Sequence, residues 1–282
     1  MCSDMNTTVR QYRWVALAAA LLLTAAPASA QYKPRAVNDP ATGEKFHIEA
    51  EADFWFPTSD IVVASAGSGT LSGLTGTNID ARRDLGLTDQ RIPMLNLTLR
   101  PARSHKFRLQ YIPVDFTQTT TLKADIVFNG IKYTLGLPVN SDLNWKTLEI
   151  GYEYDFVVKN WGFVGFDLSA KYTDVQVSLA SPVAAEFAHA RGPIPALGGI
   201  VRYYFVPNIA ITGELSGFKI PDSVDSRYNA HYVDLDIYGT LNLTNNFGIK
   251  GGYRSRDVGY LIKSDSGQFT MKGIYVGAVV RY

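Results

Sequence analysis

One stretch of the chain, residues 231–256, alternates strictly between two kinds of side chain: HYVDLDIYGTLNLTNNFGIKGGYRSR. One parity carries apolar residues and glycine, and the other carries mainly charged residues, hydroxyl-bearing residues and asparagine. A period of two predicts β-strands whose two faces meet different surroundings. The polar break at 244–246 separates two such segments, so the stretch predicts a β-hairpin with a short turn.

The register of this hairpin follows from matching its apolar positions. Pairing Leu243 with Phe247 places Asp236 opposite Arg254 and Asp234 opposite Arg256. One face is then too charged for an ordinary protein core, while the other is too continuously apolar for water. A strand with lipid on one side and an enclosed polar lumen on the other satisfies both conditions. The hairpin therefore predicts an all-β fold, a transmembrane antiparallel up-and-down β-barrel.

The same alternation recurs along the chain and predicts about ten strands, with eight or twelve as alternatives. The predicted short connections are 101–105, 157–160, 206–208 and 244–246, and the predicted long ones are 57–90, 117–144, 174–193 and 218–230. Within 117–144 the turn signal Asn129-Gly130 predicts that the two flanking strands continue past the membrane as a protruding hairpin. Bacterial barrels keep short turns in the periplasm and long loops outside, and an even strand number returns both ends to the periplasm.

Aromatic residues mark the short-turn ends of most predicted strands and are expected to form an interfacial girdle: Phe46, Phe107, Phe156, Phe205, Phe247 and Tyr282. The last strand ends in Tyr282. Such an aromatic end predicts recognition by the barrel-assembly machinery.

The beginning of the chain predicts export. Arg10 and Arg13 precede an apolar run, and small residues at 28–30 suit a signal peptidase, so residues 1–30 are expected to be a signal peptide. Residues 31–44 then form a periplasmic lead and 45–282 the barrel. Cys2 leaves with the signal, which excludes disulfides and cysteine metal sites from the exported chain.

Charge provides little information about partners. Removing two arginines and one aspartate with the signal leaves 25 basic and 25 acidic residues from 27 and 26. This balance does not suggest a nucleic acid as partner.

Charged residues gather on the inward parity of the predicted strands. Besides the matched Asp234, Arg256, Asp236 and Arg254, the predicted lumen charges are Glu49, Glu51, Asp53, Arg100, Arg108, Glu149, Glu153, Asp155, Asp167, Lys171, Arg202, Glu214, Lys250 and Arg281. They are expected to neutralise one another and fill the barrel, because a lumen of eight strands is just wide enough for side chains and ten strands add little. The alternative is a selective pore.

Four segments resemble a family of uncharacterised exported outer-membrane β-barrels of Gram-negative bacteria: Ile79–Leu87 (IDARRDLGL), His105–Tyr111 (HKFRLQY), Asp125–Gly130 (DIVFNG) and Gly151–Phe156 (GYEYDF). The four segments lie within residues 79–156, a span of about a third of the exported chain. It implies the barrel fold and no particular activity.

The function expected from these features is that of a structural or binding barrel, or a very narrow pore, which acts through its extracellular loops without a cofactor. Outer-membrane lipid and lipopolysaccharide are the expected partners of a monomer. The alternative is a membrane-embedded hydrolase, either a protease or a lipid A modifying enzyme. His231 beside Asp234 and Asp236 is the nearest catalytic candidate, but alternation directs His231 away from both aspartates. No histidine pair has a metal-ligand spacing, so neither a catalytic nor a metal site is predicted.

Overall fold

The computed structural model describes residues 41–64, 77–123, 125–128, 131–182, 185–220, 228–262 and 265–282. The predicted signal peptide and residues 31–40 of the predicted lead lie outside these ranges. No helix within these ranges has the length and apolarity needed to cross a membrane.

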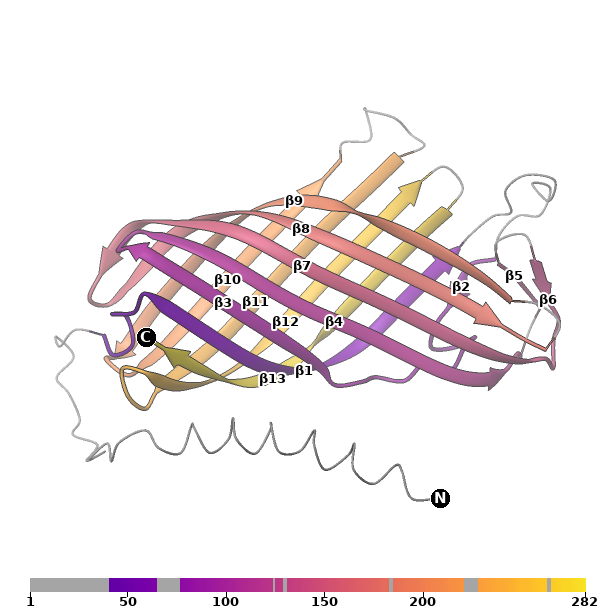
Figure 1. Cartoon of the computed structure of the whole chain (residues 1–282), viewed down its shortest axis with the longest axis horizontal. Helices are drawn as coiled ribbons and strands as arrows, with labels where there is room; N and C mark the ends of the chain where they lie inside the picture. The colour runs from indigo at the N-terminus through magenta and orange to yellow at the C-terminus, as the bar shows by residue number, and fades with distance from the viewer. Residues whose placement is uncertain are drawn as a thin grey trace, which may run out of the picture. The chain divides into compact units, whose positions relative to one another are not determined.

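Ten long strands form one antiparallel sheet that closes on itself (Figure 1). They are β1 (Ile48–Ala64), β3 (Ile92–Ala102), β4 (His105–Thr121), β7 (Pro138–Lys159), β8 (Gly162–Ala180), β9 (Ala185–Val206), β10 (Ile209–Lys219), β11 (Tyr228–Asn242), β12 (Phe247–Ile262) and β13 (Asp265–Arg281). Each pairs with its neighbours in chain order, and β13 returns to pair with β1, where Ala52 faces Ala278. The predicted up-and-down barrel of ten strands is confirmed.

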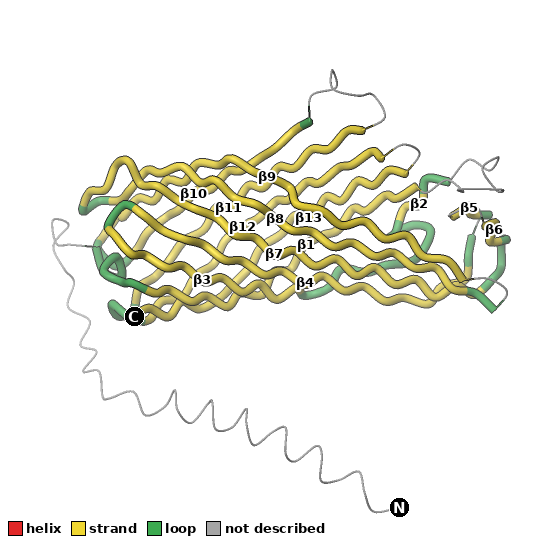
Figure 2. The backbone as a smooth tube through the Cα atoms, turned by 45° about the horizontal axis from the view of Figure 1, so that its top comes forward, coloured by secondary structure: helices red, strands yellow, loops and turns green. Residues whose placement is uncertain are grey.

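Three short strands lie at one end of this barrel. The strand β2 (Ile79–Asp80) pairs with the end of β1, while β5 (Ile126–Phe128) and β6 (Ile131–Tyr133) form a small hairpin between β4 and β7. Figure 2 shows that hairpin at the end of the molecule far from the C-terminus. The C-terminus and the turns after β3, β7, β9 and β11 lie at the opposite end, which is periplasmic by the short-turn rule.

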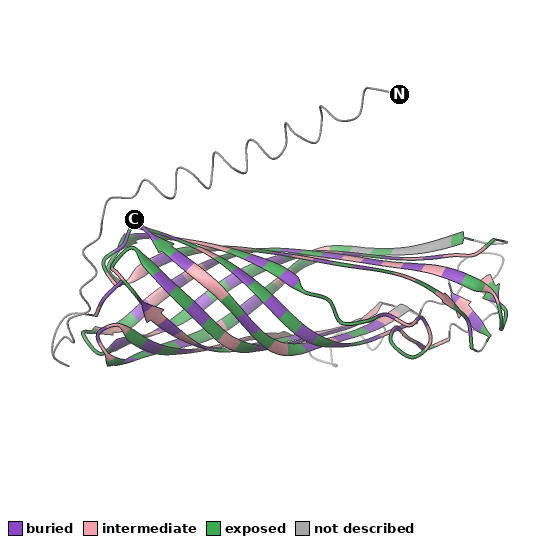
Figure 3. Ribbon diagram, turned by 90° about the horizontal axis from the view of Figure 1, so that it is seen from below, coloured by how far each residue is buried: buried purple, intermediate pink, exposed green. Residues whose placement is uncertain are grey.

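The strands alternate between buried and exposed residues along their length (Figure 3). Exposed apolar side chains form an outward band around the barrel, with Ile150 and Ile274 among the most exposed at 61% and 63%. An apolar band of this kind can only face lipid, because water would disfavour it.

The apolar face of the strands changes from the outer to the inner side part-way along their length, and β4 illustrates the change. In its periplasmic half the inward residues are Lys106, Arg108 and Gln110, and the outward ones are Phe107, Leu109 and Tyr111. In its extracellular half the inward residues include Ile112, Val114 and Phe116, and the outward ones include Asp115, Thr117 and Thr119. The barrel is therefore polar inside where lipid surrounds it, and apolar inside where water surrounds it.

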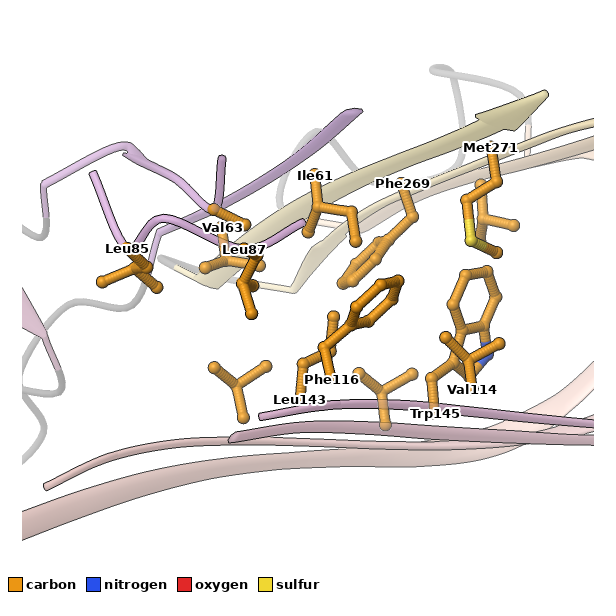
Figure 4. Packing of buried hydrophobic residues seen from close by; sticks show 14 of the residues in the cluster. Ile61, Val63, Leu85, Leu87, Val114, Phe116, Leu143, Trp145, Phe269 and Met271 are labelled. Carbon is orange, nitrogen blue, oxygen red and sulfur yellow. The ribbon is translucent and has the colours of Figure 1, made fainter. Parts of the chain in front are cut away.

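The extracellular half consequently contains a hydrophobic core (Figure 4). Phe116 and Trp145 on one wall approach Phe269 and Met271 on the other, and the Trp145 and Phe269 ring centroids are 5.3 Å apart. Leu85 and Leu87, from the segment after β2, pack against the same cluster and are 2% and 8% exposed. Residues 79–87 thus cover the extracellular end of the barrel.

Two predicted loops are therefore wrong in their boundaries. The strand β1 continues to Ala64 within the predicted loop 57–90, and β8 and β9 replace most of 174–193. The outward residues there are polar, and a pattern that expects lipid-facing residues predicts a loop in their place. Within 117–144 the predicted continuation of the strands past the membrane is confirmed, because β4 and β7 pair as far as Thr121 and Pro138 and β5 pairs with β6 as a hairpin.

The position of two prolines inside β9 has a structural explanation. The strand β10 pairs with β9 only at Leu197–Val206, so Pro193 and Pro195 lie where β9 has a free edge beside its pairing with β8. A proline lacks an N–H group and is tolerated at such an edge.

The predicted girdle is correct except at its first member. Phe107, Phe156, Phe205, Phe247 and Tyr282 are all exposed at the periplasmic end. Phe46, by contrast, precedes β1 and is buried, and its ring lies 5.3 Å from the guanidinium of Arg100. The adjacent His47 is exposed, because the alternation begins only at Ile48.

Candidate functional site

The lumen charges are organised around Asp234 on β11. Its carboxylate accepts hydrogen bonds from Arg254 at 2.7 and 2.9 Å, from Arg256 at 2.8 and 3.0 Å, and from the Tyr232 hydroxyl at 2.6 Å. The register places Asp234 opposite Arg256 and Asp236 opposite Arg254, as the sequence predicts. The Asp234–Arg256 ion pair follows this register, but the predicted Asp236–Arg254 pair does not form, because Arg254 reaches diagonally to Asp234. Asp236 instead accepts a hydrogen bond from the Tyr275 hydroxyl at 2.9 Å.

Hydrogen bonds of amide side chains connect this cluster to the opposite side of the lumen. Gln110 on β4 accepts hydrogen bonds from Arg254 at 2.9 Å and from Arg256 at 3.3 Å, and it donates one to Asn96 on β3 at 2.6 Å. Asn96 in turn donates to Asp53 and Glu51 on β1, where the Lys250 ammonium lies. A continuous set of polar contacts therefore joins opposite walls of the barrel.

A second network lies toward the periplasm. Arg108 on β4 binds Glu214 on β10 at 2.8 Å and Glu153 on β7 at 3.2 Å. Lys106 binds the same Glu153 at 2.5 Å and Asp155 at 2.9 Å. Because β4 and β10 are not neighbours in the sheet, the Arg108–Glu214 pair also spans the lumen.

The periplasmic mouth is closed by residues from the predicted lead. Glu44 binds Arg100 and Arg202, each at 3.1 Å, and accepts a hydrogen bond from the Tyr204 hydroxyl at 2.5 Å. Burial alone would raise the pKa of Glu44, but the nearby Arg202, Lys106 and Arg100 and the Tyr204 hydroxyl outweigh it and lower the pKa to about 2. Asn242 also donates a hydrogen bond to the Thr42 carbonyl at 2.7 Å, which fixes the segment to the barrel wall.

The predicted lumen residues all lie on the inner face of the barrel. Those fully buried are Glu49, Asp53, Arg100, Glu153, Asp155, Asp167, Lys171, Arg202, Asp234, Lys250, Arg254, Arg256 and Arg281, and those partly buried are Glu51, Arg108, Glu149, Glu214 and Asp236. Two further ion pairs in the lumen are Lys171 with Glu149 at 2.5 Å and Arg281 with Glu49.

The list of predicted lumen charges omits Lys106 and Glu44. The parity of β4 in the sequence already places Lys106 on the inward face with Arg108 and Gln110. Glu44 lies in a polar, proline-containing stretch outside any strand, so alternation gave no indication of it.

Glycines make room for two of the buried aspartates. Asp53 faces Gly277 on β13, and Asp155 faces Gly165 on β8. A Cβ atom at either glycine would overlap the Oδ1 atom of the facing carboxylate. Each carboxylate therefore lies against the wall of the barrel, which leaves the centre of the lumen to the longer side chains.

Little open space remains in the middle of the lumen. The cavity at its centre, between Asn96, Arg108, Asp167 and Lys250, has a volume of about 50 Å³. The next one toward the periplasm, beside Glu49 and Arg202, has a volume of about 40 Å³. Each accommodates a few water molecules. A larger cavity of about 570 Å³ lies at the periplasmic mouth, beside Glu44, Arg100 and Phe163.

The histidines are not part of the lumen networks. His231 is directed outward and lies 3.7 Å from Asp257, not from Asp234 or Asp236. His189 binds Asp174 at 2.8 Å on the outer face, and His105 contacts the Tyr152 hydroxyl at 2.6 Å. In the described part of the chain, no group of three or more His, Cys, Asp or Glu residues is arranged to hold a metal ion.

Comparisons with known proteins agree with this architecture. No family model matches the sequence, and a search of curated proteins also found no match. Among solved structures, the outer-membrane protease OmpT from Escherichia coli is similar to this chain with a TM-score of 0.53 and 7% identity, over 88% of this chain and 100% of that one.

Two further structures show weaker similarity. The translocator domain of the autotransporter NalP from Neisseria meningitidis has a TM-score of 0.40 at 7% identity, over 97% of this chain and 98% of that one. Ail from Yersinia pestis has a TM-score of 0.33 at 9% identity, over 83% and 98%. At these identities the likeness to OmpT shows the fold alone. Together with the lipid-facing band, that fold makes the chain a bacterial outer-membrane β-barrel.

Proposed function

We propose that this protein is a non-conducting outer-membrane barrel that holds a rigid binding platform outside the cell. The observation that carries the proposal is the filled lumen. Side chains from β4 reach β10 and β12 across it, and the cavities in its middle have volumes of only about 50 and 40 Å³, while a larger one of about 570 Å³ lies at the periplasmic mouth. A ten-stranded barrel with this filling leaves no path for solutes larger than water.

The extracellular half supports the binding role. Its walls are fixed by a hydrophobic core, so β4, β7 and β8 extend beyond the membrane as ordered strands and not as free loops. Their outer face is polar and includes Thr117, Thr119 and Asn140, and Leu135 near the tip is 62% exposed. A rigid polar surface with an apolar tip suits a protein or glycan partner, because little conformational entropy is lost on binding.

Conductance in a planar lipid bilayer tests this proposal. The wild-type barrel is expected to give no steady current. A variant with Gln110→Ala, Arg254→Ala and Arg256→Ala removes the central side chains and is the positive control, since it is expected to conduct if it folds. Steady conductance by the wild type would contradict the proposal and favour the narrow pore instead.

The hydrolase alternative is not favoured. The likeness to OmpT is one of fold, and His231, the nearest catalytic candidate, lies on the opposite face from Asp234 and Asp236.

A further inference from the structure

A level of basic residues surrounds the barrel directly above its apolar band, at the extracellular side. On each strand we take the first charged or polar outward residue above the band. On five of the ten strands it is basic, and these residues form what we call the basic rung: Arg91, Lys146, Arg191, Lys219 and Lys272. Arg91 immediately precedes β3, and the others lie on β7, β9, β10 and β13. All five are exposed.

The depth of the basic rung in the membrane is determined by the outward residues on its periplasmic side. Lys146 follows Leu148 on the outward face of β7, Lys272 follows Ile274 on β13, and the guanidinium of Arg91 lies 4.7 Å from the Phe54 ring. Leu148, Ile274 and Phe54 belong to the lipid-facing band. The basic groups therefore lie at the depth of the lipid headgroups and not at the tips of the loops.

Basic residues outnumber acidic ones at this level. On the described strands, the next outward residue beyond the rung is never lysine or arginine, and it is aspartate at Asp60 and Asp257. Two acidic residues occupy the rung position itself, and both have partners: Asp174 binds His189 at 2.8 Å, and Asp115 accepts a hydrogen bond from Asn144. Lys146, Arg191 and Lys272 form no ion pair with any carboxylate of the described residues. Three exposed cations thus remain available to an external anion.

We propose that the basic rung binds the phosphate groups of phosphorylated lipid A in the outer leaflet. The barrel spans the outer membrane, whose outer leaflet presents this lipid, and the rung lies at its headgroup. Lys146 and Arg191 occupy facing register positions on either side of Asp174, two strands apart. Neighbouring strands are about 4.8 Å apart, so these two bases can approach one phosphorylated headgroup together. The inference rests on the membrane location and is independent of whether the lumen conducts.

Lipid binding by purified, delipidated barrel provides the test, with bound lipids counted by native mass spectrometry. The probes are lipid A with two phosphates, the same lipid with its phosphates removed, and inorganic phosphate. The wild type is expected to bind the diphosphorylated lipid more tightly than the dephosphorylated one. Inorganic phosphate at the same phosphate concentration is not expected to displace it, because it lacks the acyl chains that occupy the apolar band.

The variant with Lys146→Gln, Arg191→Gln and Lys272→Gln is expected to lose about fivefold in affinity per basic group. The loss is therefore about 25-fold at the headgroup that Lys146 and Arg191 share and about fivefold at Lys272, which lies four strands away from both. The matched control is Arg83→Gln, Lys123→Gln and Lys132→Gln, which removes three exposed basic residues from extracellular segments away from the band and is expected to bind as the wild type does. Boiling-dependent gel migration verifies that each variant is folded.

Four results would overturn the proposal. They are equal binding of the two lipids by the wild type, unchanged affinity in a folded rung variant, an equal loss in the control variant, and displacement by inorganic phosphate. The first needs only the wild type, so the test remains decisive if the rung variant does not fold.

Discussion

The two aspartates of the β11–β12 hairpin are predicted to differ strongly in their importance for stability. Asp234→Asn removes the only carboxylate that pairs with Arg254 and Arg256 among the described residues. Both guanidinium groups are buried, at 5% and 1% exposure. Removing one partner from a buried ion pair costs about 3 to 5 kcal/mol, because the remaining charge is uncompensated. We expect a loss in this range, reduced somewhat by the hydrogen bonds that both arginines donate to Gln110.

Asp236→Asn provides the matched control on the same strand. Its carboxylate accepts one hydrogen bond, from Tyr275, which an asparagine side-chain oxygen can also accept. The expected loss is therefore about 1 kcal/mol. The two aspartate variants, Arg254→Ala and the two double mutants that combine it with either aspartate variant can be compared by their urea midpoints in detergent. The coupling energy between Arg254 and Asp234 should be large, and that between Arg254 and Asp236 should be small. Equal losses from the two aspartates, or stronger coupling to Asp236, would refute the diagonal pairing.

Two other predictions concern the mouth and the outer face of the barrel. Glu44→Gln should remove about 3 kcal/mol of stability at neutral pH, because a pKa lowered from 4.5 to about 2 contributes that much above pH 4.5 and loses it as the pH falls toward 2. The difference between wild type and variant in urea midpoint should thus shrink between pH 4.5 and 2, and a difference that stays constant would contradict this role of Glu44. Ile237→Lys, on the lipid face, should cost about 2 to 4 kcal/mol, whereas Thr117→Lys, outward but above the band, should be nearly neutral; equal folding yields of the two variants in lipid vesicles would mean that the position of the band is wrong.

Much of the fold could be predicted from alternation, because a period of two determines which side chains share a face whatever surrounds them. The ten strands, the register of the β11–β12 hairpin and the inward direction of all eighteen predicted lumen charges follow from it. The contacts among those charges do not follow. A long arginine side chain reaches diagonal neighbours as readily as the residue directly opposite, so the choice of Asp234 by Arg254 depends on the whole lumen.

The strand lengths were mispredicted for a related reason. Thr58 and Asp60 have the same outward parity as Phe54 and Phe56, but they are polar. A prediction that requires outward residues to be apolar ends this strand at the membrane surface. Parity alone, without that requirement, would have continued β1 to its observed end.

The exchange of polar and apolar faces along the strands also accounts for the two different interiors of the barrel. Within the membrane, closure of ten strands keeps the walls apart, and only long side chains such as those of Arg254, Gln110 and Arg108 can meet across the lumen. These side chains carry polar ends, which must then be paired because little water is present to solvate them.

Outside the membrane the opposing walls approach until apolar side chains touch, as Trp145 and Phe269 do at 5.3 Å between ring centroids. Burial of such rings stabilises the extension in the way that it stabilises a soluble protein. The interior is therefore polar where lipid surrounds the barrel and apolar where water surrounds it. One continuous strand meets both requirements by exchanging its residue types at Gln110–Ile112 while keeping its period of two.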